Sequence, residues 1–289
     1  MNRYIAVQKI VELGSFTKAA EALGYTQSAM SQMIASLEEE LSIKILNRSR
    51  VGVKLTVEGK ELYPFIQKTI SQYQALQEKA NEIKGLESGT IRIGTISSIS
   101  CHWLPRLIND FQTIYPNVQF LLHQGDYKTI PEWVRAGYLD FGFINPDAVT
   151  GLKTHFLKEG ELKAVLPVDH VLAKQKFVTL NELSEEPFLL LEGGTLSEPL
   201  EAFHKNGLEP NVRICLHDDY SILSMIETGL GVSILPELVL RRIGYEVAIL
   251  PINPPVTRKI GLVIKDKKTL PISSKIFIDH LIQEVNNLP

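Results

Sequence analysis

The stretch of residues 15–56 constrains this chain most, because it holds two short helical patterns followed by a basic hairpin pattern. The first helical pattern has a small apolar face that lets another helix cross it closely, and Gly24 can end it in a left-handed C-cap conformation. Thr26 is placed to cap the second helix. Apolar residues recur at helical spacing on both: Ala19, Ala20 and Leu23, then Met30, Ile34, Leu37 and Leu41. This order predicts a helix-turn-helix followed by a two-stranded wing.

The outward face of the second helix and the wing predict a DNA-binding surface. The helix presents uncharged donors and acceptors whose length suits base edges in a major groove: Thr26, Gln27, Ser28, Ser31 and Gln32. Any solvated helix face is polar too, and that is the alternative. The wing favours DNA, because Arg48, Arg50 and Lys54 alternate with small and β-branched residues around Gly52 and can hold phosphates.

Two segments, GSFTKAAEALGYTQSAMSQMIASLEEEL and ILNRSRVGVKLTVEG, resemble the LysR-type transcriptional regulators in spacing and in N-terminal position. The resemblance implies an all-α winged helix-turn-helix domain over residues 1–58, with the helix-turn-helix at about residues 18–37, that binds double-stranded promoter DNA. The chain departs from many members at Gln32 and Met33, where they have an arginine and another polar residue. It departs again at Asn47, where an acidic residue is frequent.

Composition bounds the possible classes of protein. A chain of 289 residues suffices for one small and one larger domain. A net charge of −3 argues against indiscriminate coating of nucleic acid, although residues 1–60 carry eight Lys and Arg against six Glu. No apolar run approaches the roughly 18 residues that span a bilayer, and no signal-peptide core is present, so we expect a cytoplasmic protein without a membrane partner. With only Cys101 and Cys215, there is no disulfide framework.

A long helix is predicted from about residue 57 to 84. Apolar residues follow it at alternating spacings of four and three: Leu62, Ile66, Tyr73, Leu76 and Ile83, with Thr69 and Ala80 between them. This is the seam of a coiled coil and predicts a homodimer, whereas the alternative is a helix that packs on its own domain. A dimer places two recognition helices roughly 34 Å apart for successive major grooves. The resemblance implies a linker and dimerisation helix over residues 59–88, with a hinge at GLESG, and homotetramers built from such dimers.

The rest of the chain has an α/β pattern. Strands at 91–96, 118–125 and 139–145 alternate with helices at 104–115 and 130–136, which predicts a parallel sheet covered by helices. A second group has strands at 187–194, 212–217 and 232–237 and a helix at 220–229. Segments 162–167 and 260–265 cross between the groups, and a helix at 273–286 ends the chain. This resembles the two-lobed, periplasmic-binding-protein-like effector domain of the same family, over residues 89–289, with lobe I at 90–161 and 266–289 and lobe II at 168–259.

Ligands of open parallel sheets bind beyond the carboxyl ends of the strands. The polar residues at those ends are candidate effector contacts: Thr95, Ser97, Ser98, Ser100, His102, Gln124, Asp126, Asn145, Glu192, Gly194 and Thr195. The alternative is that the hydroxyls only cap the following helix. The set contains no arginine, which favours a monoanion or a polar neutral effector over a dicarboxylate. The family implies a small-molecule effector, and no other cofactor is expected.

Three alternative functions require different features of the sequence. Cys101–His102 and Cys215-x-His217 could ligate a soft metal or sense oxidants, but both spacings are shorter than those of common metal motifs, and no metal is predicted. A cytoplasmic metabolite-binding module without a DNA role leaves the N-terminal motif unexplained. An enzyme needs a catalytic set, and no motif such as GxSxG is present. The sequence therefore predicts a regulator whose DNA binding is controlled by a small molecule.

Overall fold

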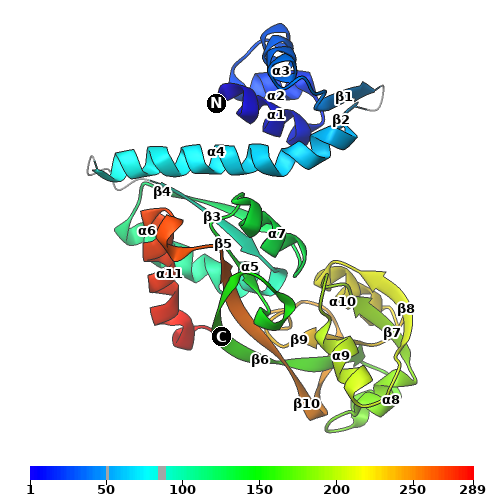
Figure 1. The fold of residues 1–289 in the computed structure, drawn as a ribbon. Coiled ribbons are helices and arrows are strands. Elements are labelled where there is room, and N and C mark those ends of the chain that lie inside the picture. Colours follow the sequence, from blue (N-terminus) through cyan, green and yellow to red (C-terminus); the bar gives the residue numbers. More distant parts are fainter. Residues whose placement is uncertain (50–51, 84–88) are drawn as a thin grey trace. The chain divides into compact units, whose positions relative to one another are not determined.

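The computed structural model describes residues 1–49, 52–83 and 89–289, which fold into two compact units (Figure 1). The first unit comprises Met1–Leu86 and Ala136–Tyr138, and the second comprises Glu87–Arg135 and Leu139–Pro289. Arg50 and most of the expected hinge lie outside the described residues. Within the described residues, no helix combines the length and apolarity needed to cross a membrane.

The first unit is the expected winged helix-turn-helix followed by a long helix. Its elements are α1 (Asn2–Leu13), α2 (Phe16–Leu23), α3 (Gln27–Leu41), the antiparallel strands β1 (Leu46–Ser49) and β2 (Gly52–Leu55), and α4 (Val57–Ile83). Gly24 ends α2 with φ 71°, and the Thr26 hydroxyl accepts the Ala29 amide at 3.2 Å to begin α3. Both caps agree with the sequence analysis.

The core of this unit shows why α3 begins and ends where it does. Met30, Ile34 and Leu37 are buried, as their spacing predicts. Leu41 was expected on the same side but is 36% exposed, because the helix ends there and Ser42 turns the chain into the left-handed region. The inner face of α3 is therefore one turn shorter than the sequence suggested.

The second unit contains a six-stranded sheet in the order β4-β3-β5-β10-β6-β9. Its strands are β3 (Gly89–Thr95), β4 (Val118–Gln124), β5 (Phe141–Ile144), β6 (Lys153–Pro167), β9 (Ser233–Pro236) and β10 (Val247–Ile264). The pairings of β3 with β4 and β5 are parallel, as predicted. The pairings of β10 with β5 and β6, and of β6 with β9, are antiparallel, so the whole sheet is mixed.

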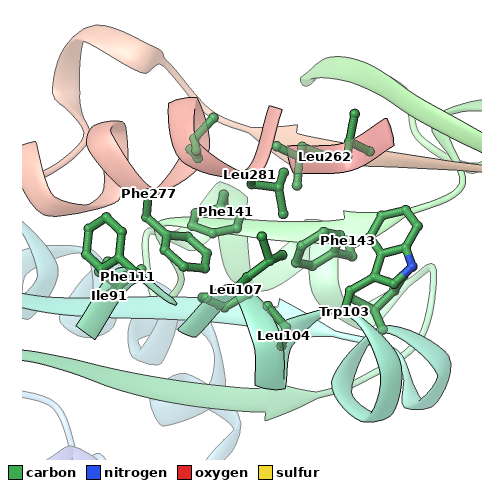
Figure 2. Packing of buried hydrophobic residues seen from close by; sticks show 14 of the residues in the cluster. Ile91, Trp103, Leu104, Leu107, Phe111, Phe141, Phe143, Leu262, Phe277 and Leu281 are labelled. Atoms are coloured by element: carbon green, nitrogen blue, oxygen red, sulfur yellow. The ribbon is translucent and has the colours of Figure 1, made fainter. Parts of the chain in front are cut away.

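A first lobe packs helices against β3, β4 and β5. Three helices surround this part of the sheet: α6 (Leu104–Ile114), α7 (Thr129–Ala136) and α11 (Ile272–Glu284). Figure 2 shows Phe111, Phe141 and Phe277 gathered in its core, and the ring centroids of Phe111 and Phe277 are 5.1 Å apart. Aromatic burial on this scale supplies a large part of the hydrophobic stabilisation of a domain. This packed core fixes the positions of the strands and therefore of the loops that follow them.

A second lobe is built from β7 (Pro187–Leu191), β8 (Asn211–Leu216) and β9, with α8 (Leu180–Ser184), α9 (Glu198–Lys205) and α10 (Asp219–Glu227). β7 and β8 are parallel. A Cβ atom on Gly231 would lie 2.3 Å from the Pro187 carbonyl oxygen, so the chain approaches β7 as closely as only glycine allows.

β6 and β10 run through both lobes (Figure 1). They pair from Lys153 opposite Ile264 to Pro167 opposite Val247, so each is much longer than the segments 162–167 and 260–265 expected from sequence. In β10, exposed polar residues alternate with buried ones, and Pro254 and Pro255 interrupt the strand pattern. These features concealed its full length.

Candidate nucleic-acid interface and ligand pocket

The exposed face of α3 carries a linked polar cluster. Gln27 Nε2 donates to Ser31 Oγ at 2.8 Å, and Arg48 Nη2 donates to the same oxygen at 3.0 Å. The guanidinium carbon of Arg48 also lies 3.7 Å from the centroid of the Phe16 ring. Stacking and hydrogen bonding together hold this cation beside the helix rather than leaving it free on the wing. The structure thus brings two expected base-contacting residues and one expected phosphate-contacting residue into one group.

The other sequence-predicted residues that the structure describes lie on α3, at its cap and on β2. Thr26 caps α3, and its hydroxyl is 3.1 Å from that of Ser28. Gln32 is exposed on the same helix, and Lys54 is exposed on β2, where its partner in register is Asn47. All of these side chains are within the first unit, whereas Arg50 falls outside the described residues.

The buried carboxylate of Glu38 holds the start of the wing against α3, a role that the sequence analysis missed. Its side chain is 7% exposed and accepts the amides of Ile45 at 2.8 Å and Leu46 at 3.1 Å, together with Lys44 Nζ at 2.7 Å. Burial alone raises the pKa of Glu38, but these hydrogen bonds outweigh it and the pKa lies below its ordinary value. Its position next to Leu37 on the inner face of α3 was the available signal.

The residues of the expected coiled-coil seam on α4 fall into a buried group and an exposed group. Ile66 is 4% exposed and packs with Ile70 in the core of the first unit, and Leu62 packs against that core. Tyr73 and Leu76 are 36% and 65% exposed. The first part of the seam is therefore used within one chain, and the later part remains accessible. The side chain of Ile83 lies outside the described residues.

A cavity of about 390 Å³ lies where the two lobes meet along β6 and β10. Five of the sequence-predicted effector residues line it: Ser97, Ser98, Gln124, Asp126 and Glu192. They come from the start of α5 (Ser97–His102), from the end of β4 and the loop after it, and from the loop after β7. The carboxyl ends of strands from both lobes thus form one pocket, as expected for an α/β sheet.

The other expected effector residues lie outside this lining in the described structure. Thr95 and Ser100 have their hydroxyl oxygens 3.0 Å apart beneath the first turn of α5. Thr195 donates to the Tyr127 carbonyl at 3.3 Å, and a Cβ atom on Gly194 would crowd Asp126. These contacts shape the loops rather than the cavity wall.

His102 and Asn145 also lie outside the lining. Nε2 of His102 is buried without a hydrogen-bond partner among the described residues. Burial and the charges of Arg241 and Arg242 lower the pKa of this imidazole. Asn145 Nδ2 donates to Glu198 Oε1 at 2.9 Å and thereby joins the end of β5 to α9.

Arg258 is a pocket residue that the sequence analysis missed. It projects from β10 into the lining, is 7% exposed, and donates from Nη2 to Ser98 Oγ at 2.6 Å. The expectation that the site lacks an arginine is therefore wrong. The signal was present, because Arg258 lies between the buried Val256 and Ile260 at the two-residue period of one strand face.

Acidic side chains occupy much of the remaining polar wall. Asp219, at the first position of α10, is 5% exposed, and burial raises its pKa above the ordinary value despite the hydrogen bond from Ser97 and the charge of Arg258. The Tyr127 hydroxyl donates to Glu198 Oε1 at 3.1 Å, so one carboxylate of the second lobe holds two side chains of the first, Tyr127 and Asn145. We call this three-residue contact the interlobe clasp.

Asp126 is committed to the backbone. It accepts the amides of Thr129 at 2.6 Å and Lys128 at 2.9 Å, as well as the Thr129 hydroxyl. Burial alone raises the pKa of Asp126, but these bonds outweigh it and the pKa lies below its ordinary value. Asp126 thus caps the helix that follows it, a role that the sequence analysis weighed only for the hydroxyl residues.

The two cysteines lie in different elements. Cys101 Sγ, in α5, accepts the Tyr220 hydroxyl at 3.4 Å, and Cys215 is exposed on β8. His217 instead faces Glu192, with Nε2 3.5 Å from the carboxylate. In the described part of the chain, no group of three His, Cys, Asp or Glu side chains is arranged to hold a metal ion.

Comparisons with known proteins decide the family. Residues 84–286 match the family model described as the LysR substrate binding domain, and residues 1–60 match the bacterial regulatory helix-turn-helix protein of the lysR family. The chain belongs to the LysR family. It is a LysR-type DNA-binding transcriptional regulator with an effector-binding domain.

Relatives extend over nearly the whole chain. The HTH-type transcriptional regulator YvbU of Bacillus subtilis is 33% identical over 274 residues, covering 94% of this chain and 94% of that protein. The transcriptional dual regulator GltC of the same organism is 32% identical over 270 residues, covering 90% of this chain and 89% of that protein. The solved structure of full-length CbnR complexed with its target DNA has a TM-score of 0.71 and 20% identity, covering 98% of this chain and 97% of that chain. This last likeness concerns the fold.

Proposed function

We propose that residues 1–58 read promoter DNA, that residues 59–88 associate two copies of the chain, and that residues 89–289 bind a small effector that changes promoter occupancy. An effector that prefers one closure of the lobes shifts the equilibrium between their arrangements, and this shift changes the affinity for DNA. The protein then acts by binding and not by catalysis. As a regulator of promoters it works in the cytoplasm, where the bacterial chromosome lies.

The observation that carries the DNA-binding part is the cluster of Gln27, Ser31 and Arg48. A glutamine can pair with adenine in the major groove, and a fixed guanidinium beside the same helix can contact the adjacent phosphate. Exposed side chains of the same unit supply further contacts: Thr26, Ser28, Gln32 and Lys54. For Arg50, which lies outside the described residues, we propose a phosphate contact on its charge and sequence position alone. Because the three central groups are already hydrogen-bonded, little side-chain entropy is lost when DNA binds.

The effector part is supported by a cavity whose walls come from both lobes. A molecule bound there touches Ser98 of the first lobe and Glu192 of the second, so its affinity depends on how far the lobes are closed. Assembly through the exposed part of α4 gives a dimer, and two dimers form the tetramer that we propose binds DNA.

Binding measurements on the full chain test the proposal. We would select genomic fragments that the purified protein enriches at increasing salt, then measure the affinity of Arg48→Gln and Gln27→Ala for the selected site and for a scrambled one. Arg48→Gln should weaken both equally and reduce the salt slope by about 1, because it removes a phosphate contact. Gln27→Ala should weaken mainly the selected site, by about 1–3 kcal/mol.

The exposed Glu21 on α2 offers a matched control, since Glu21→Gln changes charge outside the cluster. Equal loss by Gln27→Ala on both fragments would show that this residue does not read bases. Uniform weak binding of the unmodified protein to all fragments, with no enriched site, would overturn the proposed regulator.

A further inference from the structure

The pocket contains one buried cation whose charge is not matched by a direct ion pair. Arg258 is 7% exposed, and among the described residues no carboxylate oxygen lies within ion-pair distance of its guanidinium, although its charge acts on the nearby Asp219. Its hydrogen-bond partners in the wall are neutral hydroxyls, that of Ser98 at 2.6 Å and that of Tyr127. A guanidinium stays ionised when buried and presents a planar fork that suits a carboxylate. This group therefore favours an anionic end on a bound molecule.

The rest of the wall carries the opposite charge. Carboxylates of Asp126, Glu192, Glu198 and Asp219 line the same cavity as Arg258. Asp126 is occupied by backbone amides and Glu192 faces His217, whereas Asp219 is 5% exposed and burial disfavours its ionised form. A ligand with only negative charge meets more carboxylates than cations here, whereas an ammonium group near Asp219 relieves the cost of its burial.

Apolar side chains complete the lining. They come from both lobes and from the crossing strands: Ile96, Trp133, Leu162, Leu191, Leu196 and Ile234. A cavity of about 390 Å³ lies within the range of sites that enclose small metabolites. The wall thus offers one cationic point, an acidic side and an apolar remainder.

We infer that the effector is a small zwitterion, an α-amino acid with an apolar side chain, whose carboxylate meets Arg258 and Ser98 and whose ammonium group faces the second-lobe carboxylates Asp219 and Glu198. This inference rests on the proposed function and adds the chemical class of the effector. Because the carboxylates of α9 and α10 belong to the second lobe, a zwitterion whose ammonium group meets them while its carboxylate meets Arg258 favours the closed arrangement.

Calorimetric titration of the full-length protein with matched probes tests the inference. One set is phenylalanine, hydrocinnamate and phenethylamine, and the other is leucine, isocaproate and isoamylamine. In each set the second compound lacks the amine and the third lacks the carboxylate. In at least one set the amino acid should bind about tenfold or more tightly than both analogues, since each analogue loses a charge-assisted hydrogen bond and leaves its partner buried.

Substitutions assign the two ends. Asp219→Asn should reduce the preference for the amino acid over the carboxylate analogue, and Arg258→Gln should reduce the preference over the amine. Arg258→Lys keeps the charge and serves if the glutamine variant does not fold, as judged by circular dichroism. Glu201→Gln, on α9 outside this cavity, is the matched control and should change neither preference.

Three outcomes overturn the inference: a carboxylate analogue that binds as tightly as the amino acid, a preference that survives Asp219→Asn, or no binding by either set. The affinity of the same protein samples for the selected DNA site separates this failure from failure of the proposed function. Site-specific DNA binding with no amino-acid binding rejects only the zwitterion, whereas the absence of site-specific DNA binding rejects the regulator itself.

Discussion

Glu38 joins the recognition helix to the wing through a single carboxylate. Replacing it with glutamine should lower the stability of the first unit by about 1–3 kcal/mol at neutral pH, because the hydrogen bonds to the Ile45 and Leu46 amides lose their charge. Hydrogen exchange of the segment containing these amides measures the change, which should appear as faster exchange. Glu39→Gln alters the exposed neighbour and should leave the exchange rate unchanged.

The effect of Glu38 should also depend on pH, with a defined sign. Its pKa in the folded protein lies below the ordinary 4.5, so its stabilisation is complete above that pH and is lost as pH falls through the folded pKa. Calorimetric melts of the unmodified protein and of Glu38→Gln should therefore differ at neutral pH and converge in acid. A difference that stays constant with pH would show that the ionised carboxylate is not what stabilises the wing.

Glu38 and Arg258 explain where sequence reasoning about single residues failed. Both are charged residues within otherwise apolar periodic patterns, and charge by itself predicts exposure. Their burial depends on partners outside their own elements: the Ile45 and Leu46 amides, beyond the end of α3, for Glu38, and the distant Ser98 for Arg258. By contrast, Thr26 could be predicted as a cap because its partner, the Ala29 amide, is three residues away.

At the scale of elements, Asp126 positions one side of the pocket by holding the start of α7. Asp126→Ala should destabilise the second unit by about 1 kcal/mol, the usual cost of removing a side-chain cap. Urea unfolding followed by the fluorescence of Trp133, which lies in α7, and of Trp103 measures this loss. Asp110→Ala on α6 removes only a surface ion pair with Arg106 and should have a much smaller effect. Equal losses from the two variants would argue against the cap.

Helices and strands could be predicted wherever the periodic apolar pattern ran over many residues or was bounded by residues that end such elements. The strand at 118–125 and the helix at 104–115 match β4 and α6 to within a residue at either end. The helices α5 and α9 were not predicted, because the first has only six residues and the second begins at Glu198-Pro199 after a polar loop. Both carry pocket residues, so the site could be predicted less completely than the fold.

At the scale of the whole molecule, the interlobe clasp biases closure of the pocket. Tyr127→Phe removes the hydroxyl that donates to Glu198 and leaves the bond from Asn145, so the lobes should open more often. The two cysteines, one in α5 and one in β8, are both exposed and accept spin labels. Distances between the labels, measured with labelled chains diluted into unlabelled ones, should shift and broaden in Tyr127→Phe but not in the control Tyr115→Phe. Identical distributions would show that the clasp does not control closure.

Assembly should depend on the part of α4 that its own unit leaves accessible. Leu76 is 65% exposed although its spacing from Tyr73 continues the apolar seam, so a charge there should disrupt the contact between two chains. Sedimentation of Leu76→Glu should show a smaller assembly than the unmodified protein, while Gln77→Glu, which adds the same charge at the next exposed position, should keep the original mass.

Because a two-part DNA site needs two recognition helices in a fixed relation, Leu76→Glu should also lose affinity for the full site while binding half-sites as before. An unchanged mass for Leu76→Glu would place the principal contact between chains outside this stretch of α4.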